Sequence, residues 1–250
     1  MNTILIAGLG LIGGSAGMAL RRAGWRVRFL DPHVSLEDAQ RAGSADERVE
    51  TFTGDLILLA TPVDVAVDQL RTLDTTAVVT SACSVMRALR EVARGTFIAG
   101  HPLAGSQERG LGAATADLFE GKPWFVDGDH PLVDELVRDC GAMRERVTAE
   151  EHDAGVALTS HLPQVLSTAL AAYLHECGED ALRFAGGGLR TFLRLAGSDA
   201  SVWAPVLEAN RDNLAPHAAR VAELVRELMD GDARGTFAKA QATWRALAEK

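Results

Sequence analysis

The sequence is poor in cysteine, tyrosine and lysine, and it has no long uninterrupted apolar run. Its 250 residues contain three cysteines and one tyrosine. The cysteines, at 83, 140 and 177, lack the spacing of a metal site, and an odd, sparse set is typical of a reducing cytosol. No stretch is apolar enough over about 20 residues to span a membrane. We therefore expect a cytoplasmic protein with no bound metal and no membrane contact.

Basic residues are outnumbered by acidic ones, 25 to 34. The formal net charge is −9 and the isoelectric point is near 5.3, which argues against binding to nucleic acid or to an anionic membrane. The N-terminal residues have no basic stretch before the first glycine, so we expect a first strand there and not a signal peptide. A length of 250 residues predicts one large or two modest domains, and a hydrophobic content of 47% predicts a sizeable core.

Glycine, in contrast, is concentrated where it indicates a function. The apolar run at 4–6 leads into Gly8, Gly10 and Gly13, and a helical pattern follows. In a Gly-x-Gly-x-x-Gly turn the first glycine makes the bend, the second lets a pyrophosphate approach the backbone, and the third lets the helix pack on the strand. Free N–H groups at the helix start then face the phosphates. We predict that this turn binds a dinucleotide through Gly8, Gly10, Leu11, Ile12 and Gly13.

An acidic residue at the expected distance favours NAD. Asp31 ends the second apolar run, 23 residues after Gly8, and an acid about 20 residues after the turn commonly binds the ribose 2′-hydroxyl. A carboxylate there repels the 2′-phosphate of NADP. A glycine-rich loop without a ligand and an FAD site are the alternative interpretations of the turn itself.

The apolar pattern predicts an α/β domain over 1–148, followed by an all-α domain over 149–250. Short apolar runs at 2–7, 25–30, 55–60, 77–81, 96–99 and 123–127 alternate with helical segments, which predicts a Rossmann-type, doubly wound parallel sheet. Ligands bind at the carboxyl ends of such strands, so Thr61, Ser84 and His101 are expected to line one crevice.

Helices are expected over 150–176, from about 198 to 229 and over 232–248, the first apolar on nearly every face and therefore buried. Thr148 and Glu151 predict a capping box at its start. So much apolar surface in about a hundred residues predicts that helices are exchanged across a homodimer.

Several polar residues are candidates for chemistry, each with a structural alternative. His101 follows a strand and precedes a proline, so it is either a proton acceptor or a histidine that bonds a loop carbonyl. Ser84 is either a helix N-cap or a hydroxyl presented to the crevice. His161 lies two residues before Pro163, which predicts a bend in the helix. His161 itself is either a residue of a pocket at that bend or a hydrogen-bonded histidine of the core. Arg194 follows a triple glycine and suits a carboxylate, whereas helical arginines are usually solvated.

Six segments, taken together, resemble the prephenate/arogenate dehydrogenase family of tyrosine biosynthesis. They follow the family's order and cover most of the chain. The combination of HPLAGS, SHLP and an arginine nine residues before a tryptophan is specific. The segments are GLGLIGGS at 8–15, CSV at 83–85, HPLAGSQERG at 101–110, EEHD at 150–153, SHLP at 160–163 and RLAGSDASVW at 194–203.

The resemblance implies an NAD-dependent oxidative decarboxylation of a small dicarboxylate, in which a cyclohexadienol becomes a phenol. It implies that His101 deprotonates the ring hydroxyl, that Ser84 assists, and that Arg194 pairs with a substrate carboxylate. His161 is expected beside the pocket, and Trp203 resembles a residue that closes the site from the partner subunit. The helical half corresponds to the family's dimerisation domain.

Three departures from the family pattern surround the expected substrate. Met86 stands where a lysine is common, Gln164 where a histidine is common, and Thr191 where an acid is common. Gln164 is expected to contact the substrate but carries no charge. We predict prephenate as the substrate, with arogenate, or both compounds, as the alternative.

Two other classes of function share these features in part. A β-hydroxyacid dehydrogenase or imine reductase usually needs a lysine in its helical domain, but lysine occurs only at 122, 239 and 250 here. A non-catalytic dinucleotide sensor needs none of His101, Ser84 and Arg194.

Overall fold

The computed structural model describes residues 2–105, 108–231 and 233–248, which form two compact units. The first contains Met1–Val156 and Ala196–Asn210, and the second contains Ala157–Leu195 and Arg211–Lys250. Each is described by itself. The domain boundary predicted after residue 148 stays a prediction, because these units are defined by contacts and not by independent folding.

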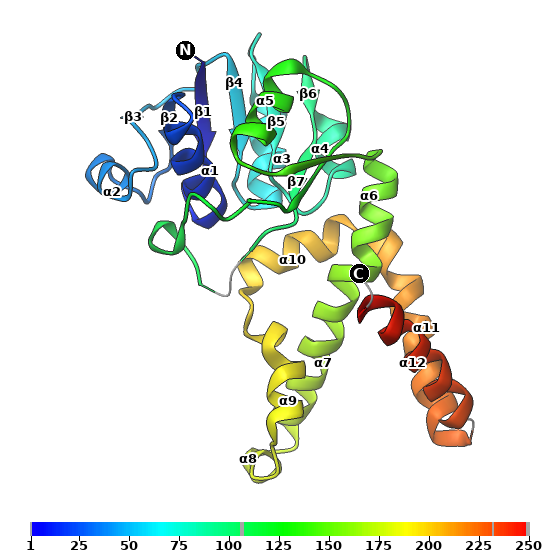
Figure 1. Cartoon of the computed structure of the whole chain (residues 1–250). Helices are drawn as coiled ribbons and strands as arrows, with labels where there is room; N and C mark the ends of the chain where they lie inside the picture. The colour runs from blue at the N-terminus through cyan, green and yellow to red at the C-terminus, as the bar shows by residue number, and fades with distance from the viewer. Residues whose placement is uncertain (1, 106–107, 232, 249–250) are drawn as a thin grey trace. The chain divides into compact units, whose positions relative to one another are not determined.

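The first unit is built on a six-stranded parallel sheet, which confirms the predicted Rossmann-type fold (Figure 1). The strand order is β3-β2-β1-β4-β5-β6, the doubly wound arrangement, so the order reverses between β1 and β4. The strands are β1 (Thr3–Ala7), β2 (Arg26–Leu30), β3 (Glu47–Arg48), β4 (Leu56–Leu59), β5 (Val78–Ser81) and β6 (Phe97–Ile98).

Alternating side chains of the central strands supply two separate cores. Ile4 and Ile6 of β1 join one core with helices α1 (Leu11–Arg22), α2 (Leu36–Ala42) and α5 (Pro131–Asp139). Leu5 and Ala7 join the other with α3 (Val63–Thr72) and α4 (Arg87–Val92). Burial on both faces explains why these strands are nearly continuous apolar runs.

A second, three-stranded sheet contains residues that we expected in the first. The run at 123–127 forms β8 (Pro123–Val126), which pairs antiparallel with β7 (Gly100–Pro102) and parallel with β9 (Met143–Arg146). The prediction that this run belongs to the doubly wound sheet is therefore wrong. The short 3-10 helix η1 (Leu111–Ala113) precedes β8.

Two further helices belong to the first unit. In α6 (Ala149–Val156) the predicted capping box is confirmed, because the Glu151 N–H donates to the Thr148 hydroxyl at 3.1 Å and the Glu151 carboxylate accepts the Thr148 N–H at 3.0 Å. The other helix, α10 (Ala200–Ala209), adds Val206 to the core beside α3 and α4.

The second unit is helical. It contains the π-helical turn η2 (Ala157–His161), α7 (Leu162–Glu176), α8 (Glu179–Leu182), α9 (Gly187–Phe192), most of the 3-10 helix η3 (Leu193–Gly197), α11 (Arg211–Asp230) and α12 (Ala233–Ala248). The π-helical turn lies just before Pro163, where an interior proline removes a helical hydrogen bond.

One expectation for these helices is wrong, because the segment expected from 198 to 229 is interrupted at Asn210. The segment 150–176 is partly buried within one chain: Ala157 and Leu162 are buried, whereas Leu158 is 49% and Tyr173 62% exposed. Its burial across a dimer stays a prediction. Among the described residues, no helix has both the length and the apolar character needed to cross a membrane.

Candidate active site

The glycine turn between β1 and α1 has the geometry of a dinucleotide cradle. Gly8 has φ +87°, and a Cβ atom there would lie 2.7 Å from the Ala60 carbonyl oxygen. A Cβ atom on Gly13 would lie 1.9 Å from the Gly8 oxygen, so both glycines are required by the fold. Gly10 differs, because no atom other than those of its two chain neighbours lies within 4 Å of the corresponding position. The space that a ligand needs is therefore open at Gly10.

The start of α1 presents hydrogen-bond donors to this space. The helix begins at Leu11, and no side chain caps it. The N–H groups of Leu11, Ile12 and Gly13 belong to its first turn and have no acceptor within the helix. Together with the positive end of the helix dipole, they suit a pyrophosphate.

Asp31 follows β2 and bonds the glycine turn directly. One carboxylate oxygen accepts the Leu9 N–H at 2.8 Å, and the other accepts the His33 N–H at 2.7 Å. Each oxygen has a second lone pair, so the carboxylate can still accept a ribose hydroxyl. The residues of the turn thus fit NAD.

The carboxyl ends of β4 and β5 meet beside this turn. A Cβ atom on Gly8 would also lie 3.0 Å from Thr61, and the Cys83 thiol lies 3.6 Å from the Thr61 oxygen. The Thr61 hydroxyl itself donates to the Gln69 side chain at 3.0 Å. Burial raises the pKa of Cys83 to about 12, so this thiol is protonated at neutral pH and is not a nucleophile.

His101 lies in β7, opposite Phe125 of β8, and β7 is anchored to the main sheet. The buried Ser81 hydroxyl, at the end of β5, both donates to the Gly100 oxygen and accepts the Gly100 N–H, each at 3.1 Å. A Cβ atom on Gly100 would lie 2.7 Å from the Ser81 oxygen, so only glycine permits this approach. His101 is thereby held at the carboxyl edge of the sheet. Ser106 and Gln107 of the same motif lie outside the described residues.

Ser84 does not cap a helix, so the capping interpretation is wrong. Helix α4 begins at Arg87, and its first N–H groups are bonded by Asp153 of α6. The two carboxylate oxygens accept from Met86 and Arg87 at 2.9 and 3.0 Å. Ser84 lies in the loop before this cap and is half-buried.

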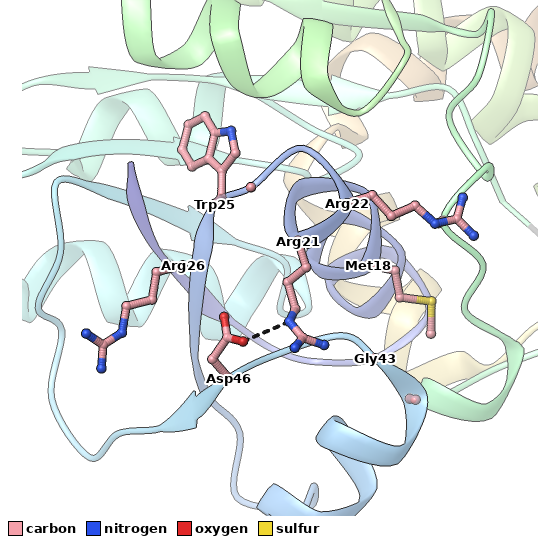
Figure 2. Close-up of a pocket in the computed structure, with 10 residues that line it drawn as sticks. Met18, Arg21, Arg22, Trp25, Arg26, Gly43 and Asp46 are labelled. Carbon is pink, nitrogen blue, oxygen red and sulfur yellow. Dashed lines mark hydrogen bonds and ion pairs between the residues drawn. The ribbon is translucent and has the colours of Figure 1, made fainter. Parts of the chain in front are cut away.

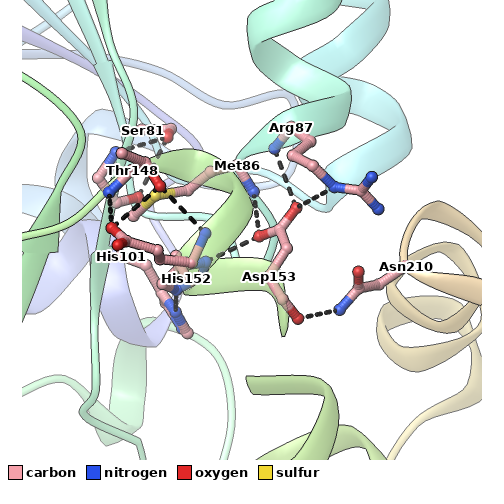
Figure 3. Close-up of polar contacts among 10 residues, drawn as sticks. Ser81, Met86, Arg87, His101, Thr148, His152, Asp153 and Asn210 are labelled. Carbon is pink, nitrogen blue, oxygen red and sulfur yellow. Dashed lines mark hydrogen bonds and ion pairs between the residues drawn. The ribbon is translucent and has the colours of Figure 1, made fainter. Parts of the chain in front are cut away.

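Two residues that sequence reasoning missed are bonded in line with His101 (Figure 3). His101 Nδ1 lies 2.9 Å from His152 Nε2, and His152 Nδ1 lies 2.8 Å from an Asp153 oxygen. The side chains of His152 and Asp153 are 1% and 0% exposed. The only signal in the sequence was the adjacent His-Asp pair of the EEHD motif.

The other predicted substrate residues are divided between the two units. In the second unit His161 is buried, and the Gln164 amide donates to the Leu195 oxygen at 2.9 Å and to the Thr168 hydroxyl at 3.1 Å. Gln164 therefore fixes the segment that carries the exposed Arg194. In the first unit Trp203 of α10 packs on the core beside α3 and α4. The convergence of Arg194 with His101 concerns separate units and stays a prediction.

A hollow of about 700 Å³ lies at the other edge of the sheet, where α1 ends and β2 begins (Figure 2). Its arginines are engaged by carboxylates, as in the 2.9 Å ion pair of Arg21 with Asp46. It is lined by residues such as Met18, Trp25 and Gly43 and contains none of the predicted site residues.

The fold and the glycine turn define a Rossmann-type dinucleotide-binding protein with a helical second part. Models of two domains match the chain: the prephenate dehydrogenase nucleotide-binding domain over residues 16–131, and the prephenate dehydrogenase dimerization domain over 148–234. The chain belongs to the prephenate dehydrogenase family, which confirms the resemblance.

Individual relatives agree with this assignment. The probable prephenate dehydrogenase NovF of Streptomyces niveus is 34% identical over 93% of this chain and 71% of its own length. A cyclohexadienyl dehydrogenase of Zymomonas mobilis is 27% identical over 85% and 82%. A crystal structure of prephenate dehydrogenase from A. aeolicus, in complex with hydroxyphenyl propionate and NAD+, is 26% identical and covers 99% of this chain and 96% of its own, with a TM-score of 0.83.

Proposed function

We propose that this protein is an NAD-dependent prephenate dehydrogenase that forms 4-hydroxyphenylpyruvate in tyrosine biosynthesis. The observation that carries the proposal is the placement of His101 and the glycine turn at the carboxyl edge of one sheet. Membership of the family and the A. aeolicus complex with NAD+ support it.

The proposed reaction needs one base and one hydride acceptor. His101 takes the proton of the ring hydroxyl while the hydrogen on the same carbon leaves as hydride, which NAD accepts. The dienone that results loses its ring carboxylate as carbon dioxide. The electron pair of the broken bond completes an aromatic ring, and the phenolate oxygen regains a proton from His101. Aromatisation supplies the driving force, so the proposal requires no metal.

The remaining residues bind and orient. The glycine turn, with the first turn of α1, holds the pyrophosphate, Asp31 holds the ribose, and Thr61 lies beside the nicotinamide half. Ser84 orients the hydroxyl or the imidazole. On the substrate side Arg194 pairs with a carboxylate, and we assign His161 and Gln164 to the pocket wall. Trp203 closes the site from the partner subunit.

One assay tests the proposal: NADH formation followed with NAD and NADP against prephenate and arogenate in parallel. We expect turnover with NAD and prephenate. The similarity to a cyclohexadienyl dehydrogenase of Z. mobilis supports a second candidate function, in which the substrate is arogenate or both compounds. Tight NADH binding without turnover on either compound would instead identify a sensor.

Two variants test the assigned roles. His101→Asn is expected to lower kcat by about 10²–10⁴-fold with little change in KM, because a general base supplies that much. Arg194→Gln is expected to raise the KM of the substrate, since it removes a charged carboxylate partner. Normal turnover in the first variant, or an unchanged KM in the second, contradicts the role concerned.

We also propose that the protein acts in the cytoplasm as a homodimer formed through its C-terminal helices. The match to a dimerization domain over 148–234 and the exposed apolar residues of the second unit support the dimer. The sparse, unpaired cysteines support the compartment.

A further inference from the structure

The buried pair His152 and Asp153 has a function that the reaction scheme above does not use. Both residues lie in α6, whereas His101 lies in β7, 51 residues earlier in the chain. The His101 ring, the His152 ring and the Asp153 carboxylate form a continuous line of hydrogen bonds (Figure 3). The distance is 2.9 Å between the two rings and 2.8 Å between the His152 ring and the carboxylate. The imidazole rings meet edge to face, with an interplanar angle of 84°.

The direction of each hydrogen bond follows from Asp153, the last residue of the line. The Asp153 carboxylate accepts from Met86 N–H, from Arg87 N–H and from His152, and the Arg87 guanidinium nitrogen lies 3.6 Å away. A carboxylate surrounded by donors can only accept, so His152 Nδ1 carries a hydrogen. In neutral His152 the other nitrogen, Nε2, is then an acceptor.

The same reasoning determines which ring nitrogen of His101 carries the hydrogen. Its Nδ1 faces the acceptor nitrogen of His152 and must therefore donate. A neutral imidazole carries one hydrogen, so the lone pair of His101 lies on Nε2. This nitrogen points away from His152 and is the basic atom of the ring.

We propose that His152 and Asp153 are positioning residues that hold His101 in the tautomer with hydrogen on Nδ1 and so make Nε2 the base. The inference rests on the proposed function for the meaning of that base, but the tautomer itself is independent of it. When His101 accepts the hydroxyl proton, the buried carboxylate two hydrogen bonds away stabilises the cation.

Asp153 also links the two catalytic candidates. Its carboxylate fixes the N–H groups at the start of α4, immediately after the loop that carries Ser84. Its own carbonyl accepts the Asn210 amide at 2.7 Å, which ties α6 to the end of α10. One buried residue thus orients the hydroxyl loop through the backbone and the imidazole through His152.

A purely structural role is the competing explanation, because the removal of a buried polar residue commonly lowers stability and activity together. The tautomer of His101 distinguishes this structural role from the positioning role. It is read from the ring ¹⁵N chemical shifts of protein labelled on its seven histidines, with the His101 signals assigned by their loss in His101→Asn. The measurement is made on the whole chain, above the pH at which the ring is protonated.

The variants are His152→Phe, which keeps a ring beside Phe125 but has no acceptor, and His152→Gln, whose side-chain oxygen can accept the His101 hydrogen. We expect hydrogen on Nδ1 in the unaltered protein and a mixture with the Nε2–H form in His152→Phe. The kcat of His152→Phe should fall by about 10–100-fold, a part of what the base supplies, with KM for NAD unchanged. His152→Gln should restore most of the Nδ1–H tautomer of His101 and most of kcat.

Asn210→Ala is the matched control, because it breaks a buried bond to Asp153 outside the line and should leave the tautomer unchanged. Hydrogen on Nε2 of His101 in the unaltered protein overturns the inference, whatever the variants do. An unchanged tautomer in His152→Phe also overturns it, even where activity falls. If His152→Phe does not fold, the unaltered protein and His152→Gln still decide. An active His101→Asn variant, in contrast, overturns the proposed function and leaves the tautomer standing.

Discussion

Gly10 and Gly13 belong to one motif but serve different purposes. A side chain at Gly13 collides with backbone, 1.9 Å from the Gly8 oxygen, whereas a side chain at Gly10 meets only open space. Gly13 is needed by the fold, and Gly10 is needed by the ligand. Sequence reasoning assigned both roles, because the motif is local and its geometry is the same in every chain that folds this way.

Alanine at each position should therefore separate folding from binding. We expect Gly13→Ala to lose about 1–3 kcal/mol of stability through overpacking, and to bind NADH poorly as a consequence. Gly10→Ala should keep its melting temperature and lose at least about tenfold in NADH affinity, as its methyl group blocks the pyrophosphate. Thermal unfolding and calorimetric titration check these outcomes. Equal NADH affinity in Gly10→Ala and the unaltered protein would contradict the assigned position of the ligand.

Long-range contacts between single residues were beyond prediction. His101 was identified because a histidine between a strand and a proline stands out locally. His152 and Asp153 were not, because nothing in the EEHD motif says that a ring 51 residues earlier lies against it. Ser84 shows the reverse: a local rule gave a helix cap as one of its two interpretations, but Asp153 from α6 already bonds that helix start.

At the scale of elements, prediction succeeded where burial is two-sided. Strands β1, β4 and β5 of the main sheet are apolar on both faces and were placed to within a residue or two. The charged edge strand β3 (Glu47–Arg48) was not predicted. Strands β7 and β9 were missed because their sequences, Gly-His-Pro and Met-Arg-Glu-Arg, carry no such pattern. They are strands because β8 lies between them and pairs with both. The site depends on β7, so its surroundings were the hardest part to predict.

The capping box of α6 makes a prediction about pH. The hydrogen bond from the Thr148 N–H holds the pKa of Glu151 below its ordinary value. A lowered carboxylate pKa means that stability is present above the unfolded pKa and is lost as the pH falls through the folded pKa. Glu151→Gln should therefore melt about 1–2 °C below the unaltered protein at pH 7, and the gap should be smaller at pH 3, where more of the Glu151 carboxylate is protonated.

Glu150→Gln is the control, since Glu150 is an exposed acid one residue earlier and outside the capping box. Its melting temperature should follow that of the unaltered protein at both values of pH. A gap between Glu151→Gln and the unaltered protein that stays constant down to pH 3 would show that the carboxylate charge contributes nothing to the cap.

At the scale of the whole molecule, the second unit leaves too much apolar surface in water for a single chain. Phe184 is 88%, Met229 79% and Trp244 70% exposed. The helix over 150–176 is only partly buried within one chain: Ala157 and Leu162 are buried, whereas Leu158 and Tyr173 are exposed. The second copy of the unit that we propose would cover these exposed faces. Sequence patterns indicate that a face is to be buried, but not whether the same chain buries it.

Helix α12 offers a direct test of the dimer. Phe237, Trp244 and Leu247 recur at spacings of seven and three residues, which places them on one face, and each is at least 63% exposed. If this face meets a second copy, Trp244→Lys buries an unpaired charge at the interface and should shift the protein to monomer at micromolar concentration in analytical ultracentrifugation. Ala242→Lys adds the same charge on the opposite face and should remain dimeric. A dimer that survives Trp244→Lys unchanged would place the interface elsewhere on the helical unit, whereas dissociation of both variants would point to net charge as the cause.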